Sequence, residues 1–333
     1  MNYGDLIKDA FWLTLRNRYL WFFGFFAGGT SVGGNFSFPS GGSGGFDDDD
    51  FDDFGEPGQG DFGGPSTAAP GFDPGQWIFD NLALILAIVA LVALIALFFI
   101  VMSLISQGAL AESVAAIDRG ESRRFSSAFR AGVSNFWRVL GYYLLFILIA
   151  LGLLLAIGVP LALLAVGVFA GTESVGARIL TVVLAGLVGI ALLIVVFIPL
   201  SIIGQFALRE IVVRRERVVA SIGSGYRLFR RNLGKSLLVW LIQLAVSIGV
   251  GIALLIALLL VAFVLALPAI ILAVAGYTTA AIVAGIVAAL ILLPILLVAA
   301  GAFGTFGHSY WTLAYLRLVA PTEGATPQPG QGT

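Results

Sequence analysis

Three polar residues, Gln107, Gln205 and His308, stand out in a chain whose long apolar stretches offer few groups able to do chemistry. His308 is the single histidine, and the chain has no cysteine. A metal site or a general base needs further ligands or an orienting carboxylate, and the surrounding sequence GTFGHSYWTLAY supplies neither. We therefore expect a protein that is not an enzyme, with no cofactor, no metal and no catalytic residue.

An internal repeat brings these three residues into register. SLISQGALAE at 103–112 matches SIIGQFALRE at 201–210 with six identities in ten positions, so the chain contains a duplication. In this register the two glutamines and the histidine correspond. Either they form a polar cluster at the inner face of the protein, or they hydrogen-bond between helices, with the histidine at the membrane interface beside aromatic residues.

A fainter third copy opens the chain, and each copy carries large apolar residues four apart, followed by an asparagine. The positions that correspond are Ile7, Phe11 and Asn17, then Phe125, Phe129 and Asn135, then Ile222, Tyr226 and Asn232. The spacing predicts a short amphipathic helix lying at the membrane surface in front of each pair of spanning helices.

Basic residues accompany the second and third of these asparagines. They are Arg130, Arg138, Arg227, Arg230, Arg231 and Lys235. Such side chains can contact the headgroups of anionic lipids or a membrane-protein partner, or they can simply anchor and orient the helices. A formal net charge of −1 gives no indication of a nucleic-acid partner.

Composition and the spacing of charges predict an all-α, polytopic transmembrane helix bundle. The chain is 59% hydrophobic and 11% charged over 333 residues. Its long uncharged stretches predict six spans arranged as three helical hairpins. The longest, 81 residues between Lys235 and Arg317, must hold two spans divided near Pro268 or the GYTT at 276–279. The first stretch, after Arg18, is short and either crosses fully or inserts only in part.

The distribution of charge predicts the topology. In the six-span arrangement 17 of the 18 Lys and Arg residues fall on one side, which identifies the cytoplasm, and only Arg178 lies outside. Both termini are then cytoplasmic, and the acidic, glycine-rich loop at 29–76 is external. No Asp, Glu, Lys or Arg is expected within a span, which argues against a buried proton relay.

The predicted organisation is one membrane domain over 1–320 with a disordered tail at 321–333. The repeats extend over about 103–205 and 201–308. The segment ERVVASIGSGYRLFRRNLGKSLLVWL at 216–241 resembles the membrane domain of bacterial glycerophosphodiester phosphodiesterases and its stand-alone prokaryotic relatives. The resemblance implies a prokaryotic plasma (inner) membrane. It carries over no catalytic residue, because the phosphodiesterase activity belongs to a separate soluble domain.

Three functions remain open from the sequence. The leading prediction is a non-enzymatic integral membrane protein that interacts with lipids, anionic ones at the inner face, or with a membrane partner. The alternative is a transporter or channel for a neutral or apolar solute or a lipid. An enzyme acting on a lipid headgroup is the third, with Glu112, Glu210 and His308 as its candidate polar groups.

Overall fold

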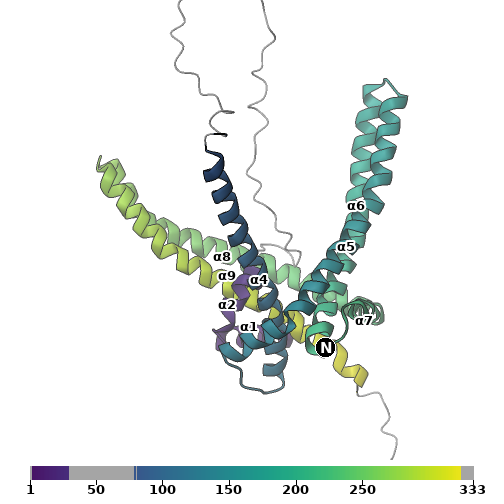
Figure 1. Cartoon of the computed structure of the whole chain (residues 1–333), viewed down its shortest axis with the longest axis horizontal. Coiled ribbons are helices and arrows are strands. Elements are labelled where there is room, and N and C mark those ends of the chain that lie inside the picture. Colours follow the sequence, from purple (N-terminus) through teal and green to yellow (C-terminus); the bar gives the residue numbers. More distant parts are fainter. Residues whose placement is uncertain (1, 30–78, 80, 324–333) are drawn as a thin grey trace, which may run out of the picture. The chain divides into compact units, whose positions relative to one another are not determined.

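The computed structural model describes residues 2–29, 79 and 81–323, and this part of the chain forms helices and turns without a strand. Five of its helices are long and apolar enough to cross a membrane (Figure 1). They are α4 (Leu82–Asp118), α5 (Phe125–Gly171), α6 (Val175–Val213), α8 (Leu233–Val274) and α9 (Thr278–Glu323). The protein is thus a helical, multi-pass membrane protein.

Internal contacts divide the chain into two units. One unit comprises Met1–Phe36 and Val101–Thr333, and the packing described below lies within it. The other is Ser37–Ile100, whose described part is chiefly the first half of α4. The apolar side chains along that half of α4 are exposed, as suits a surface that meets lipid.

Two helical hairpins form the larger part of the first unit. Helices α5 and α6 pack along each other, as do α8 and α9 (Figure 1). The turn between α8 and α9 falls at Gly276, whose φ of +84° is a conformation that glycine adopts without strain. Of the two predicted dividing points, the segment at 276–279 is therefore right, while Pro268 lies inside α8.

Short helices pack against the ends of the long ones. Helix α1 (Tyr3–Arg16) packs against α9, and α7 (Val218–Arg231) packs against α6. In the middle copy the expected separate helix is absent, because α5 runs without a break from Phe125 into its apolar part. Two residues after Asn232 the chain has Gly234, where the middle copy has Trp137 after Asn135, and glycine favours a break in the helix.

The first apolar segment forms two short turns of helix, α2 (Leu20–Gly24) and the π-helix η1 (Phe25–Gly29). Ten helical residues rise about 15 Å, half of the ~30 Å hydrocarbon core. Most of the predicted acidic loop at 29–76 and of the tail at 321–333 lies outside the described residues.

A close helix crossing holds the first apolar segment against α9. Gly24 faces Gly301 and Thr305 so closely that a Cβ on either glycine would overlap the backbone of the facing helix. The Thr305 hydroxyl donates a hydrogen bond to the Leu20 carbonyl at 3.0 Å. Small residues at such a crossing let two backbones approach and gain packing contacts, which drive helix association in lipid.

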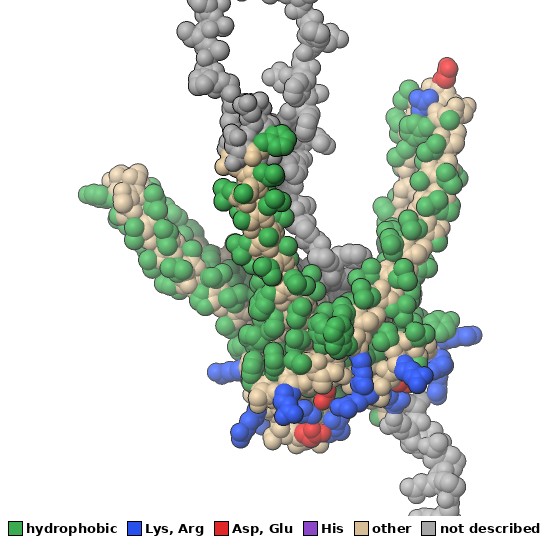
Figure 2. All heavy atoms as spheres, viewed as in Figure 1, with side chains coloured by type: hydrophobic (Ala, Val, Ile, Leu, Met, Phe, Trp, Pro, Cys, Tyr) green, Lys and Arg blue, Asp and Glu red, His purple; other side chains and the backbone are tan. Residues whose placement is uncertain are grey.

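The buried core lies at one end of the long helices, which we call the inner end because its basic residues predict a cytoplasmic position. In α6 every residue from Ile202 to Val212 is buried, as is every residue from His308 to Tyr315 in α9. The outer parts of both hairpins expose most of their large apolar side chains. Figure 2 shows this division, with hydrophobic side chains along the hairpins and Lys and Arg gathered at the inner end.

Candidate functional site

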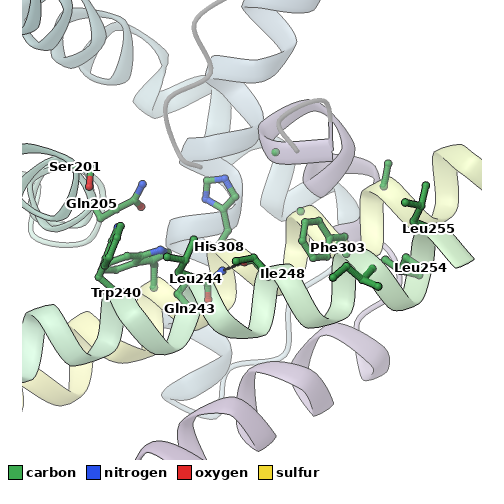
Figure 3. A pocket seen from close by; sticks show the side chains of 18 of the residues that line it. Ser201, Gln205, Trp240, Gln243, Leu244, Ile248, Leu254, Leu255, Phe303 and His308 are labelled. Carbon is green, nitrogen blue, oxygen red and sulfur yellow. Dashed lines mark hydrogen bonds between the residues drawn. The ribbon is translucent and has the colours of Figure 1, made fainter. Parts of the chain in front are cut away.

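A groove of about 1010 Å³ runs between α6, α8 and α9, with Gly28 of η1 at its inner end. Most of its lining is aliphatic or aromatic, from Leu193 to Ile198 in α6 and from Trp240 to Leu258 in α8. Figure 3 shows α8 and α9 forming one wall, with Phe303 and Leu255 in the apolar part. The groove thus offers an apolar channel within helices that suit a membrane.

Polar side chains gather at the inner end of the groove. They are Ser201, Gln205, Gln243, Ser247 and His308. In Figure 3 the Gln205 side chain points toward the His308 ring, although the two residues lie far apart in the sequence. The Gln243 Nε2 donates to Ser247 Oγ at 3.1 Å, and Gln243 Oε1 has no partner among the described residues.

The hydrogen bond of His308 defines its tautomer. His308 Nε2 lies 3.4 Å from the Ala27 carbonyl oxygen, which can only accept, so Nε2 carries the proton. In the neutral ring Nδ1 is then an acceptor, and it has no partner within the described part of the chain. His308 is 8% exposed, so this acceptor is one of the few polar atoms at a buried part of the groove.

Arg209 lies one helical turn beyond Gln205 and is fully buried at 0% exposure. Its Nη1 donates to the Gln205 carbonyl oxygen at 2.9 Å and also to Gln205 Oε1. Tyr142, Tyr143 and Tyr315 are near enough to interact with it electrostatically. Helix α6 continues past Arg209 to Val213, so Arg209 does not stand at a helix end but is buried by the surrounding helices.

Of the three polar residues that the repeat brings into register, two line the groove. Gln205 and His308 do so, whereas Gln107 is not part of the lining. Gln107 instead accepts a hydrogen bond from the Tyr143 hydroxyl, and its Nε2 lies 3.4 Å from Ser103 Oγ. In the middle copy the hydrogen-bond partners of the glutamine therefore lie in helices α4 and α5.

All six basic residues predicted to contact headgroups are exposed at the inner end. They are Arg130, Arg138, Arg227, Arg230, Arg231 and Lys235. Large apolar side chains of the same segments are also exposed, notably Trp137 and Tyr226. Aromatic and basic side chains together are typical of the boundary between membrane and water.

Arg209 is the functional candidate that sequence reasoning missed. Its signal was present in the repeat, because the corresponding positions hold Ala111 and Thr312, so the arginine is the departure of one copy from the others. When spans are predicted from the stretches between charged residues, every charged residue is placed at the end of a helix. Burial depends on the neighbouring helices, which such a prediction does not consider.

One comparison with known proteins gives a match. A family model described as a family of unknown function (DUF7544) matches residues 16–322, from the last residue of α1 into the final turns of α9. The chain belongs to the DUF7544 family. Neither the curated proteins nor the solved structures contain a match to it.

In this DUF7544 protein the family match spans the groove and its polar inner end together. Among the described residues, no three His, Asp or Glu side chains are grouped in a way that could hold a metal ion. The chemistry that the site offers is hydrogen bonding at the end of an apolar channel, next to a buried guanidinium.

Proposed function

We propose that this DUF7544 protein is a non-enzymatic membrane protein that binds a lipid, with the hydrocarbon tail in the groove between α6, α8 and α9. The observation that carries the proposal is the groove itself, an apolar channel of about 1010 Å³ with polar groups confined to one end. A lipid has the same division between a long apolar tail and a polar head. In a bilayer, lipid tails are the molecules available to fill such a channel.

The length of the groove supports a lipid rather than a small solute. Along α8 its lining extends from Trp240 to Leu258. Eighteen helical steps rise about 27 Å, close to the ~30 Å thickness of the hydrocarbon core. Each CH₂ group that packs against the apolar lining contributes a small dispersion energy. A long tail has many such groups, so their summed contribution is large.

The proposal is tested by filling the groove. Gly251 lines it and has open space where a Cβ would lie, so Gly251→Phe adds a ring to the groove at a position whose Cβ meets no neighbouring atom. Gly249→Phe is the matched control, because Gly249 is equally open, lies about 200° around the same helix and does not line the groove.

We expect native mass spectrometry of gently extracted protein to show about tenfold less retained lipid for Gly251→Phe than for Gly249→Phe, a loss of about 1.4 kcal/mol of binding. Size-exclusion chromatography and helical circular dichroism check that both variants fold. Equal lipid retention by the two variants would refute the proposal.

Lipid transport is the second candidate, and the length of the groove is the observation that favours it. A channel that extends over most of the hydrocarbon core suits a tail that moves between leaflets. The same pair of variants tests whether the protein transports lipid. The protein is reconstituted in vesicles, and a fluorescent phospholipid reports movement between the leaflets. Transport requires wild type and Gly249→Phe to exchange the reporter between leaflets faster than empty vesicles, and Gly251→Phe not to.

For the topology we propose six spans, with both termini in the cytoplasm of a prokaryotic cell and the acidic loop outside. The support is the bias of basic residues toward the inner end. The chain has no cysteine, so a single introduced cysteine reports the accessibility of its own position without background labelling. In whole cells an impermeant maleimide should label Asp50→Cys and Glu173→Cys, and should label Lys8→Cys only after permeabilisation. Protection of position 50 would contradict a crossing by the first apolar segment.

The resemblance to the phosphodiesterase membrane domain stays a prediction, as does a membrane-protein partner. The lipid proposal does not depend on either, because it rests on the groove and its lining.

A further inference from the structure

We infer that the lipid in the groove is an anionic phospholipid with a hydroxyl-bearing head, recognised at the inner end through Gln205 and the buried charge of Arg209. This inference rests on the proposed function, since it presupposes that a lipid tail fills the groove. It assigns the recognition of charge to a buried residue instead of the six exposed basic ones.

The first step is the incomplete pairing of Arg209. Nε and Nη2 of its guanidinium have no hydrogen-bond partner among the described residues, although the side chain is fully buried. The adjacent carboxylate, Glu210, pairs with Arg214 at 3.7 Å. A buried charge that is only partly hydrogen-bonded and has no carboxylate partner among the described residues is costly inside a membrane protein, and such a residue is by default a candidate for function. An anionic ligand supplies the missing negative charge.

The second step is the path from Arg209 to the groove. A guanidinium can only donate, so Gln205 must turn its Oε1 toward Arg209. The Gln205 amide NH₂ is then the part of the side chain left for the groove, and the neighbouring charge strengthens it as a donor. Trp311, which also lines the groove, has an indole N–H without a partner among the described residues. Phosphate oxygens only accept hydrogen bonds, so they suit these donors.

The third step concerns the unpaired acceptors at the same end. His308 Nδ1 and Gln243 Oε1 both lack a donor within the described part of the chain. A bare phosphodiester cannot satisfy them, because it has no proton to give. A head that carries hydroxyl groups next to its phosphate donates to these acceptors while the phosphate accepts from Gln205. Both sets of atoms then have partners in one headgroup.

The exposed basic residues provide a contrasting kind of interaction. Arg227, Arg230, Arg231 and Lys235 are exposed, and salt in solution screens the charge of exposed groups. They attract any anionic surface. Selection of one headgroup requires desolvated, oriented groups such as the pair of Arg209 and Gln205.

The experiment uses the full chain equilibrated with an equimolar mixture of three dioleoyl lipids, phosphatidylglycerol, phosphatidylmethanol and phosphatidylcholine, and native mass spectrometry of what it retains. Phosphatidylmethanol has the same charge as phosphatidylglycerol but lacks its hydroxyls. Wild type should prefer phosphatidylglycerol over phosphatidylcholine by about tenfold or more, as expected for a buried charge-assisted contact. It should prefer phosphatidylglycerol over phosphatidylmethanol by about threefold to tenfold.

Four variants separate the groups. Arg209→Gln should abolish the preference for both anionic lipids. Arg209→Lys keeps the positive charge and should retain most of that preference. Gln243→Met should remove only the preference for phosphatidylglycerol over phosphatidylmethanol. Trp311→Phe removes the indole N–H, keeps an aromatic ring and should lower the retention of both anionic lipids, so it tests the donor array even where Arg209→Gln does not fold.

The outcomes distinguish the two proposals. If Gly251→Phe retains as much lipid as wild type, the proposed function fails and this inference with it. If Gly251→Phe loses lipid but Arg209→Gln and Trp311→Phe keep the wild-type preference, only this inference is overturned. The same holds if replacing Arg227, Arg230, Arg231 and Lys235 by glutamine removes the preference for anionic lipids, because the exposed residues then select the lipid.

Discussion

The inner end of the protein and the outer parts of its hairpins belong to the same long helices but pack in opposite ways. At the inner end, Ile202–Val212 of α6 is buried without interruption, and polar as well as apolar side chains take part. Toward the outer turn the same helix exposes Leu184, Leu187 and other large apolar residues. The inner end therefore has to be specific in its contacts, whereas the outer parts need only be apolar enough for lipid.

The largest effect is expected where two backbones touch at the inner end. Gly301→Leu places a side chain against the backbone of Trp21, which cannot move without displacing the first apolar segment. Overpacking of this kind costs about 3 kcal/mol or more. We expect a lower midpoint of thermal unfolding, followed in detergent by intrinsic fluorescence.

The control for this substitution lies in the outer part of the same helix. Beyond its own stretch of helix backbone, Gly285 has no atom within 4 Å of the point where a Cβ would lie, so Gly285→Leu should leave the unfolding midpoint unchanged. Equal destabilisation by the two substitutions would mean that the inner and outer parts of α9 do not differ in packing as described.

A smaller effect is expected from the asparagines of the repeat, and it sharpens the comparison within the inner end. Asn135 is 1% exposed, and its Nδ2 donates to Glu112 Oε2 at 2.8 Å and to the Ala131 carbonyl at 2.9 Å. Asn135→Ala leaves both acceptors without this donor and should cost about 1–3 kcal/mol in the free energy of unfolding.

The corresponding Asn232 is only partly buried and makes one side-chain hydrogen bond, to the Leu228 carbonyl at 3.3 Å. Asn232→Ala should therefore cost about 0.5–1 kcal/mol. Equilibrium unfolding of both variants in a denaturing detergent gives the comparison. If Asn232→Ala proves the more damaging of the two, burial does not set the value of these hydrogen bonds.

Several features of the fold could be read from local patterns. The apolar stretches predicted the helices, and one of the two predicted dividing points, the GYTT at 276–279, is the turn between α8 and α9, with Gly276 at a positive φ. The repeat also identified residues that meet in space, since Gln205 and His308 line one groove. The predicted cluster also included Gln107, but in the structure Gln107 does not line this groove and instead accepts a hydrogen bond from the Tyr143 hydroxyl. The register of a repeat shows which residues are equivalent, but it does not show which side chains each of them contacts in the folded protein.

The site itself depended on contacts between distant segments. Gln243, Trp240 and Trp311 line the groove only because α8 and α9 pack together and meet α6. In the sequence these residues look like any polar or aromatic residue near a helix end. Arg209 likewise resembled one more basic residue of the cytoplasmic loop, while the structure shows it fully buried.

The sequence by itself determined that this is a helical membrane protein, because hydrophobicity and helix length are sums over neighbouring residues. It also determined the internal repeat and the concentration of basic residues on one side. Only the tertiary structure decided which polar groups are desolvated, which atoms lack partners and where an apolar channel remains. Those properties depend on how separate helices meet, and the free energy of a buried charge or an unpaired hydrogen bond arises at that point.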